Sequence, residues 1–176
     1  MNELSHLEDP NEDEATCGSC WAFSTVAAME GALFVSSGNL VSLSEQDLVS
    51  CDKNGDQGCN GGLMDNAFDW IKSNGICSEA DYPYDAEKDS CAVCNTTATI
   101  TGCYDVPPQD AKAMMSAVAI QPVSIAIEAD QPSFQFYQSG VYDDPGCGSN
   151  LDHGVLVVGY TADAWIVKNS WGPSWG

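Results

Sequence analysis

Residues 17–23, of sequence CGSCWAF, place a cysteine at the predicted start of a helix. Ser19 is a favourable N-cap. The residues that follow are spaced for one face of a helix, and they are Phe23, Val26, Ala27, Glu30, Leu33 and Phe34. The Ser-Ser-Gly run at 36–38 predicts the end of this helix. A helix N-terminus carries a partial positive charge and free N–H groups, so we expect a depressed thiol pKa at Cys20.

Further short motifs follow in the chain. They are GCNGG at 58–62, DYPY at 81–84, LDHG at 151–154 and KNSWG at 168–172. With CGSCWAF, and in this order, they resemble the papain-like cysteine proteases, closest to the cathepsin L type. In that family a histidine and an asparagine lie about 130–150 residues after the cysteine. Here His153 and Asn169 fall at those separations from Cys20.

The resemblance runs from about residue 16 to residue 176 and implies an α+β, papain-like two-domain fold with the active site in the cleft between the halves. The sequence divides in the same way. Residues 1–15 are an acidic stretch that we interpret as a flexible lead-in. Residues 16–103 form a predicted helical half with the nucleophile. Residues 104–176 form a strand-rich, barrel-like half that holds the histidine and the asparagine.

Local patterns place the elements within these halves. Ser44 with Asp47 resembles a capping box and predicts a short helix towards Cys51. The stretch 77–102 is predicted to be mostly loop. The other expected elements are helices over 63–73 and 109–119 and strands over 122–127, 155–159 and 164–167.

The resemblance assigns chemical roles to the matching residues. Cys20 corresponds to the nucleophile, whose thiol needs a nearby base before it can attack a carbonyl. His153 corresponds to that base, and it later protonates the leaving amine. Asn169 would fix the tautomer and direction of the imidazole, and Trp171 would cover that hydrogen bond from water. No cofactor and no metal is expected.

Glu14 departs from the family pattern. In the family, a glutamine six positions before the nucleophile donates a side-chain N–H to the developing oxyanion, and the backbone N–H of the nucleophile, here Cys20, is the second donor. An ionised Glu14 donates nothing and repels the oxyanion, and loss of one such donor costs about 10²–10³ in turnover. A protonated Glu14 still donates and favours acidic pH. Two interpretations stay open: Glu14 lies at the oxyanion position, or residues 1–15 lie elsewhere.

Substrate contacts are also carried over by resemblance. Gly61 and Gly62 would pair with the substrate main chain as an added strand would. Small and apolar residues match the wall of the S2 subsite and suggest bulky apolar side chains at P2. The floor of S2 would lie beyond Gly176. The full set of matching substrate-binding residues is Gly18, Gly61, Gly62, Leu63, Met64, Ala126, Leu151, Asp152, Gly154 and Trp171.

Nine cysteines in 176 residues indicate disulfides and an oxidising compartment. The resemblance pairs Cys17 with Cys59 and Cys51 with Cys91, and it leaves Cys147 unpaired. The sequence does not decide which two of the remaining cysteines pair; they are Cys77, Cys94 and Cys103.

Composition narrows the partners and the location. The formal net charge of −21 argues against nucleic acid and anionic membrane surfaces. The disulfides and the glycosylation sequon at Asn95 favour a secretory route, to a lysosome or vacuole or out of the cell. The resemblance implies a monomer that meets peptide or protein substrates, a pro-segment and cystatin-like inhibitors. The family's signal peptide, pro-segment and closing strands are not found, so we expect a chain without the usual ends.

Other readings compete with proteolysis. Cys17 and Cys20 form a C-x-x-C, which occurs in thioredoxin-like redox pairs, although no strand pattern precedes it. Zinc binding by cysteines is disfavoured because no second C-x-x-C with matching ligands accompanies the first. The strongest rival is a catalytically impaired or silent papain-like homologue or fragment, which Glu14 and the missing terminal strands would explain.

Overall fold

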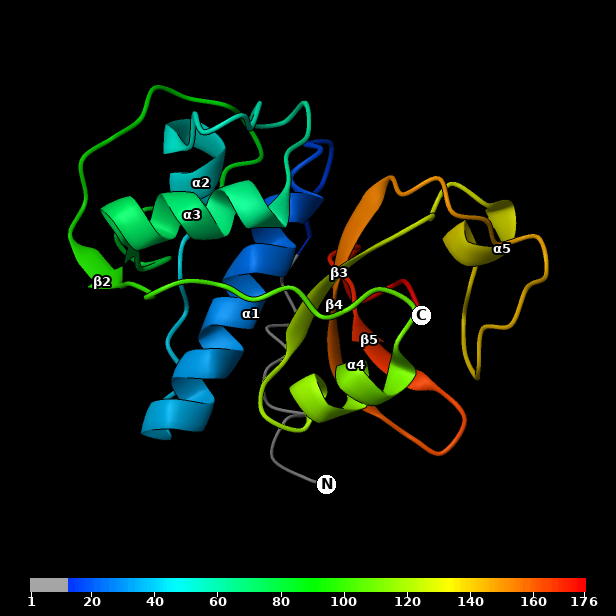
Figure 1. Ribbon diagram of the computed structural model, residues 1–176. Coiled ribbons are helices and arrows are strands. Elements are labelled where there is room, and N and C mark those ends of the chain that lie inside the picture. The colour runs from blue at the N-terminus through cyan, green and yellow to red at the C-terminus, as the bar shows by residue number, and fades with distance from the viewer. Residues whose placement is uncertain (1–12) are drawn as a thin grey trace.

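The computed structural model describes residues 13–176. Its central element is α1 (Cys20–Ser37), which runs between two groups of elements (Figure 1). On one side lie α2 (Glu45–Cys51) and α3 (Met64–Asn74). On the other side lies a three-stranded sheet. This arrangement confirms the α+β class.

The helix α1 is buried on every face along most of its length, because both groups of elements pack against it. All residues from Trp21 to Gly31 are buried. The expectation of a single apolar face was therefore too narrow. Its predicted end is confirmed, since Gly38 adopts the left-handed conformation and its N–H donates to Phe34 O at 2.8 Å.

Ser19 stands at the N-cap position of α1, but its side chain does not cap the helix. Its hydroxyl instead lies 2.6 Å from the hydroxyl of Tyr84. The predicted capping role of Ser19 was therefore wrong, because a residue far along the chain takes its hydroxyl.

The short helix α2 begins as its sequence predicts, with Ser44 Oγ accepting from Asp47 N at 3.0 Å. The second half of the expected capping box is absent. Asp47 Oδ2 accepts from Cys77 N at 3.1 Å, while Ser44 N donates to Cys77 O at 3.0 Å. The cap thus joins α2 to the strand that contains Cys77.

The stretch 77–102 contains more order than was predicted. β1 (Ile76–Cys77) pairs antiparallel with β2 (Thr96–Ala98). A disulfide between Cys77 and Cys94 closes the intervening loop. These strands are too short to show a period in the sequence.

The second half of the chain builds the larger sheet. Its strands are β3 (Val123–Ile127), β4 (His153–Tyr160) and β5 (Trp165–Lys168), antiparallel in the order β3-β4-β5. The predicted strands are confirmed, and β4 begins two residues earlier than expected, at His153.

Two helices accompany this sheet. The predicted helix over 109–119 is α4 (Ala111–Val118), and the Asp110 carboxylate caps it by accepting from two backbone N–H groups. The short α5 (Pro132–Gln135) was not predicted. The division at residue 103 stays a prediction. Among the described residues, no helix has both the length and the apolar character needed to cross a membrane.

Candidate active site

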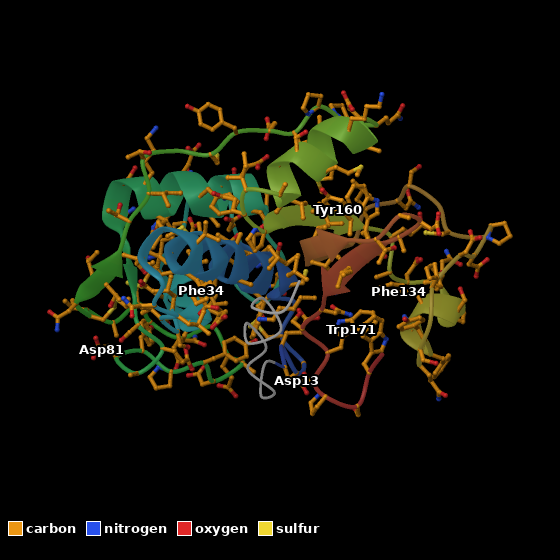
Figure 2. The ribbon with its side chains drawn as sticks, turned by 90° about the horizontal axis from the view of Figure 1, so that it is seen from below. Asp13, Phe34, Asp81, Phe134, Tyr160 and Trp171 are labelled. Atoms are coloured by element: carbon orange, nitrogen blue, oxygen red, sulfur yellow. A yellow bond between two sulfur atoms is a disulfide. The ribbon has the colours of Figure 1, made fainter. Side chains whose placement is uncertain are left out.

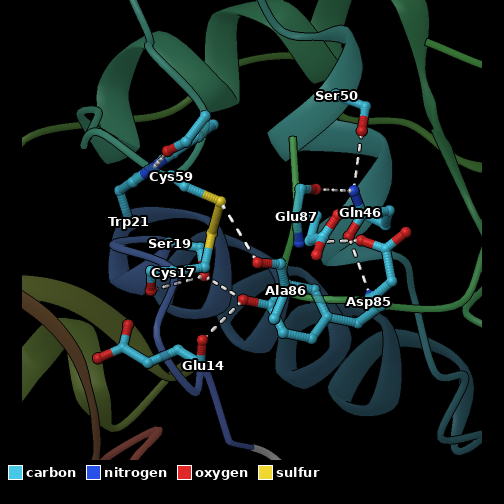
Figure 3. The surroundings of a disulfide bond; sticks show 12 residues. Glu14, Cys17, Ser19, Trp21, Gln46, Ser50, Cys59, Asp85, Ala86 and Glu87 are labelled. Atoms are coloured by element: carbon cyan, nitrogen blue, oxygen red, sulfur yellow. Dashed lines mark hydrogen bonds between the residues drawn. A yellow bond between two sulfur atoms is a disulfide. The ribbon is translucent and has the colours of Figure 1, made fainter. Parts of the chain in front are cut away.

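Cys20 is the first residue of α1, and the loop before it is fixed against the loop around Cys59. Figure 3 shows the Cys17–Cys59 disulfide that joins the two loops. Gly18 N donates to Cys59 O at 3.0 Å. A Cβ on Gly18 would lie only 2.7 Å from that same oxygen, so a larger residue would push the loops apart. The glycine is therefore required for this close approach.

Trp21, directly after Cys20, holds the loop that contains Gly58. Its indole Nε1 donates to Gly58 O at 3.1 Å (Figure 3). A Cβ on Gly62 would lie 2.6 Å from the Trp21 ring. The sequence-predicted pair Gly61 and Gly62 is thus held beside the start of α1.

Two buried carboxyl groups support this loop, and no pattern in the sequence predicts them. Asp56 Oδ1 accepts from Leu63 N at 2.8 Å. The side chains of Asp52 and Asp56 are 0% and 6% exposed. Burial, and after it the neighbouring Asp56 carboxyl, raise the pKa of Asp52 to about 7. Asp52 therefore keeps a proton to higher pH than a solvated carboxyl does.

His153 is the first residue of β4, and its imidazole is buried between Asn169 and Trp171. Its Nε2 lies 2.7 Å from Asn169 Oδ1, which also accepts from Ser170 N at 2.9 Å. Because Oδ1 can only accept, Nε2 carries the proton and Nδ1 of the neutral ring has the free lone pair. The Trp171 ring lies 4.8 Å from the imidazole, centroid to centroid, as expected for a cover over this bond.

Three side chains from separate segments converge at this point. One carboxylate oxygen of Glu14, the Cys20 sulfur and one ring nitrogen of His153 all lie within 4.8 Å of one another. Of the two interpretations of Glu14, the structure therefore places it beside the nucleophile. Cys20 and His153 come from different halves of the chain, as the resemblance implied.

The backbone of Glu14 is anchored on both sides. Its N–H donates to Ser170 O at 3.0 Å, and its carbonyl accepts from the Tyr84 hydroxyl at 3.0 Å. Its side-chain Oε1 accepts from Trp171 Nε1 at 2.9 Å. Figure 2 shows Asp13 and Trp171 on the same side of the molecule, and these two residues form a β-bridge.

The prediction that residues 1–15 form a flexible lead-in was therefore wrong for residues 13–15. Residues 13–15 belong to the site because strand-like and side-chain contacts hold them, and the remainder, residues 1–12, lies outside the described residues. Tyr84 is a positioning residue that the sequence analysis missed. Its only sign was its place in the DYPY motif.

Burial dominates the protonation of the site. It raises the pKa of Glu14 to about 7, against the lowering effect of the Trp171 hydrogen bond. Burial also raises the pKa of the Cys20 thiol, while the backbone N–H groups of Gly154 and Trp21 lower it and the Glu14 charge raises it. The predicted depressed pKa of Cys20 was wrong in direction, because the sequence does not show how far α1 is enclosed. Burial likewise lowers the pKa of His153.

Some predicted substrate-binding residues lie together. Ala126 is the register partner of Gly154, and a Cβ on Gly154 would lie 3.2 Å from Met64 Sδ and 3.1 Å from Cys20 O. Leu63 and Leu151 are 63% and 65% exposed.

Asp152, beside His153, has a structural contact. Its Oδ1 accepts from Ala129 N at 2.7 Å, which ties the segment before β4 to the segment after β3.

The cysteines agree with the pairing that the resemblance implied. The disulfides are Cys17–Cys59, Cys51–Cys91 and the additional Cys77–Cys94. Cys20, Cys103 and Cys147 are free. Since Cys17 is bonded to Cys59, the C-x-x-C redox interpretation is contradicted.

Comparison with known proteins places this arrangement in a family. The sequence model described as "Papain family cysteine protease" matches residues 6–176. The chain belongs to the papain family of cysteine proteases.

Among its relatives, "Cathepsin L1" of Drosophila melanogaster is 56% identical, over 94% of this chain and 47% of its own length. "Senescence-specific cysteine protease SAG39" of Oryza sativa subsp. indica is 51% identical, over 95% of this chain and 51% of its own length. The chain thus spans about half the length of these curated relatives. The crystal structure of the Carica candamarcensis cysteine protease CMS1MS2 in complex with E-64 superimposes with a TM-score of 0.93 at 38% identity, over 98% of this chain and 82% of that one. The papain-like fold is thereby confirmed.

Proposed function

We propose that the chain is a cysteine endopeptidase with Cys20 as nucleophile, His153 as general base and acid, and Asn169 as the residue that orients the imidazole. One observation carries this proposal: the 2.7 Å contact between His153 Nε2 and Asn169 Oδ1. It leaves Nδ1 as the ring nitrogen that can accept a proton, in a residue whose ring lies within 4.8 Å of the Cys20 sulfur.

The first half of the reaction forms an acyl-enzyme. The Cys20 thiol proton moves to His153, which gives a thiolate–imidazolium pair, and the sulfur attacks the carbonyl carbon of the peptide bond. The resulting oxyanion collapses, the carbon–nitrogen bond breaks, and the imidazolium gives its proton to the leaving amine. A thioester to Cys20 remains.

The second half releases the acid product. Neutral His153 takes a proton from a water molecule, whose oxygen attacks the thioester carbonyl. The carbon–sulfur bond then breaks, and Cys20 recovers its proton from the imidazolium. Trp171 supports both halves because its ring, 4.8 Å from His153, limits the access of water to the bond with Asn169.

Glu14 is the proposed side-chain donor to the oxyanion, together with the backbone N–H of Cys20. Glu14 Oε1 accepts a hydrogen bond from Trp171 Nε1. Glu14 Oε2 is buried and has no hydrogen-bond partner among the described residues. A proton on Oε2 would make Glu14 a neutral donor. Because burial raises the pKa of Glu14 to about 7, this form dominates in acid.

The proposed specificity is for bulky apolar residues at P2. Gly154 lies beside two other wall residues, as the register partner of Ala126 and close to Met64 Sδ, and both Gly154 and Ala126 are small. Gly61 and Gly62 are proposed to bind the substrate main chain. Pro-segment or cystatin-like inhibitors, a monomeric state, and a lysosomal, vacuolar or extracellular location on the secretory route are proposed on the family alone.

The test compares peptide substrates that differ only at P2, under reducing, mildly acidic conditions. We expect substrates with Phe or Leu at P2 to be cleaved faster than the substrate with Arg, by about tenfold or more for one mismatched side chain. Cys20→Ser is the matched control and removes all cleavage. Preference for Arg would reject the S2 assignment, and a parent chain as inactive as Cys20→Ser at every pH would establish the silent alternative.

A further inference from the structure

We propose that Glu14, Cys20 and His153 form a binding site for one zinc ion, and that the bound ion blocks the nucleophile. The site uses the residues of the proposed function, but its binding test does not depend on catalysis. No metal is expected here from the cysteine motifs alone. The structure brings together one sulfur, one nitrogen and one oxygen ligand from separate segments.

The separations suit a small tetrahedral ion. Zinc binds sulfur at about 2.3 Å, imidazole nitrogen at about 2.0–2.1 Å and carboxylate oxygen at about 2.0–2.2 Å. The ligand atoms of a tetrahedral site therefore lie about 3.4–3.6 Å apart. The three atoms here lie within 4.8 Å of one another, so modest side-chain rotations close the site.

The residues behind the ligands already hold them in orientations suited to a metal. Asn169 Oδ1 accepts from His153 Nε2, so the lone pair is on Nδ1. A zinc-bound histidine normally donates its second ring N–H to an oxygen in this way. Trp171 Nε1 donates to Glu14 Oε1, while Oε2 is buried and has no hydrogen-bond partner within residues 13–176. Such an orphaned oxygen is costly unless a proton or a cation satisfies it.

The charges of the three ligands balance those of the ion. A thiolate on Cys20 and a carboxylate on Glu14 together offset the two positive charges of zinc, and the imidazole of His153 is neutral. Because a zinc ligand must be deprotonated, binding releases the thiol proton and any proton on Glu14.

Glu14 is the residue that distinguishes this site from a cysteine–histidine pair alone. A glutamine at position 14 would keep the shape and the hydrogen bond from Trp171, yet its neutral amide would leave the site one positive charge in excess. Glu14, which stands where the family has its oxyanion-donating glutamine, thus supplies a metal ligand. Because the Cys20 sulfur is then a ligand, the ion inhibits attack on a substrate.

The test uses cobalt(II) as an optical probe and zinc as the competitor, with the disulfides intact. In a Cys103→Ser, Cys147→Ser background, Cys20 is the only free thiol. A cobalt–thiolate charge-transfer band can then arise from Cys20 alone. We expect one equivalent of cobalt to produce this band and one equivalent of zinc to remove it. Competition with a chelator gives the zinc affinity.

Three variants assign the ligands. Substituting the hydrogen-bond partner of a ligand typically costs about 10–100-fold in metal affinity. Glu14→Gln, which removes a ligand itself, is therefore expected to lower zinc affinity by about 100-fold or more. Cys20→Ser should abolish the cobalt band. Asp163→Asn removes an exposed charge after the far end of β4 but no ligand, and it should bind zinc as the parent does.

The outcomes separate this proposal from the proposed function. Equal zinc affinity of Glu14→Gln and the parent, or an equal loss in Asp163→Asn, would overturn the three-ligand site, because either result means diffuse binding to an acidic surface. A chain that binds zinc through these ligands but cleaves no peptide refutes the protease proposal alone. A chain that cleaves peptides and shows no cobalt band refutes the zinc site alone.

Discussion

Cys20 follows a loop, residues 13–19, that is fastened by a disulfide and by side-chain hydrogen bonds, whereas His153 begins a strand whose position is set by its neighbours in the sheet. On the first side the main contacts are Cys17–Cys59 and the indole of Trp21 on Gly58. On the second side His153 is the register partner of Ile127. We therefore expect the position of Cys20 to depend on single side chains and on the Cys17–Cys59 disulfide. The position of His153 should depend on the sheet.

Glu14 is the residue that touches both sides. Its carbonyl accepts from Tyr84 and from Cys17 N, on the side of the nucleophile. Its N–H and its carboxylate bind Ser170 and Trp171, on the side of the base. Substitutions of the Glu14 side chain should therefore alter the reactivity of Cys20 and His153. The backbone bonds of residue 14 should keep both groups in place.

The largest effect is expected from breaking the nucleophile side. The double variant Cys17→Ala, Cys59→Ala should lose about 3–4 kcal/mol of unfolding free energy, since it opens a loop of 42 residues. It should also slow alkylation of Cys20, because the loop before α1 is released. Chemical denaturation and mass-spectrometric mapping of iodoacetamide labelling measure the two effects.

Cys51→Ala, Cys91→Ala is the matched control, because its loop of 40 residues has nearly the same chain entropy. It should lose similar stability with no change in Cys20 labelling below the unfolding midpoint. If both double variants slow the labelling of Cys20 equally, the first disulfide has no special role in positioning the nucleophile.

The next effect sharpens the comparison at the residue shared by both sides. In metal-free buffer, Glu14→Gln should raise turnover about a hundredfold near pH 9, well above the Glu14 pKa of about 7, because a neutral donor replaces an anion beside the oxyanion. The gain should shrink as the pH falls through about 7, where the parent gains its own donor proton. KM should change little, since the donor acts mainly in the transition state.

Turnover of both proteins across the pH range, with active sites titrated, measures this gain. Asp163→Asn serves as control, since it removes an exposed negative charge away from Glu14 and provides no donor, and its profile should stay close to that of the parent. A Glu14→Gln profile that coincides with the parent's at every pH would show that Glu14 does not act on the oxyanion.

The smallest effect concerns Asp52 and Asp56, the buried carboxyl pair that supports the loop beside Cys20. The pKa of Asp52 is raised to about 7 in the folded chain, above its usual unfolded value. Its favourable contribution is therefore complete below about pH 4 and is lost as the pH rises through about 7. Asp52→Asn, which imitates the protonated acid, should stabilise the chain at pH 8 by about 2 kcal/mol and leave it unchanged at pH 4.

Unfolding midpoints across this pH range measure the effect. Asp69→Asn, on the exposed face of α3, is the control and should leave the pH profile unchanged. If the parent and Asp52→Asn lose stability in parallel between pH 5 and 8, the proton is not held at this pair.

The sequence patterns correctly predicted those features of the fold that depend on residues close together in the chain. The end of α1 at Gly38, the cap of α2 at Ser44 and the three strands of the larger sheet were all visible in the sequence. The Asn169 contact of His153 was implied by resemblance rather than by pattern.

The errors arise where distant segments meet. Tyr84 takes the hydroxyl that Ser19 was expected to use as a cap. Burial of Cys20 outweighs the helix terminus, and that burial depends on chain segments far from α1. The carboxyl pair of Asp52 and Asp56 was missed because two acids in a polar loop are indistinguishable in sequence from solvated ones.

The enclosure of α1 has a consequence for dividing this chain. Its side facing the sheet is joined to the second half by hydrogen bonds from Ser24 Oγ to Val155 O and from Ser124 Oγ to Ser24 O, both at 2.8 Å. Ala27 and Ala28 share a buried cluster with Leu156. A fragment of residues 104–176 would expose the apolar face that α1 covers. The border between the halves is thus not a border between folding units, and two fragments cut there are expected to become structured only when mixed.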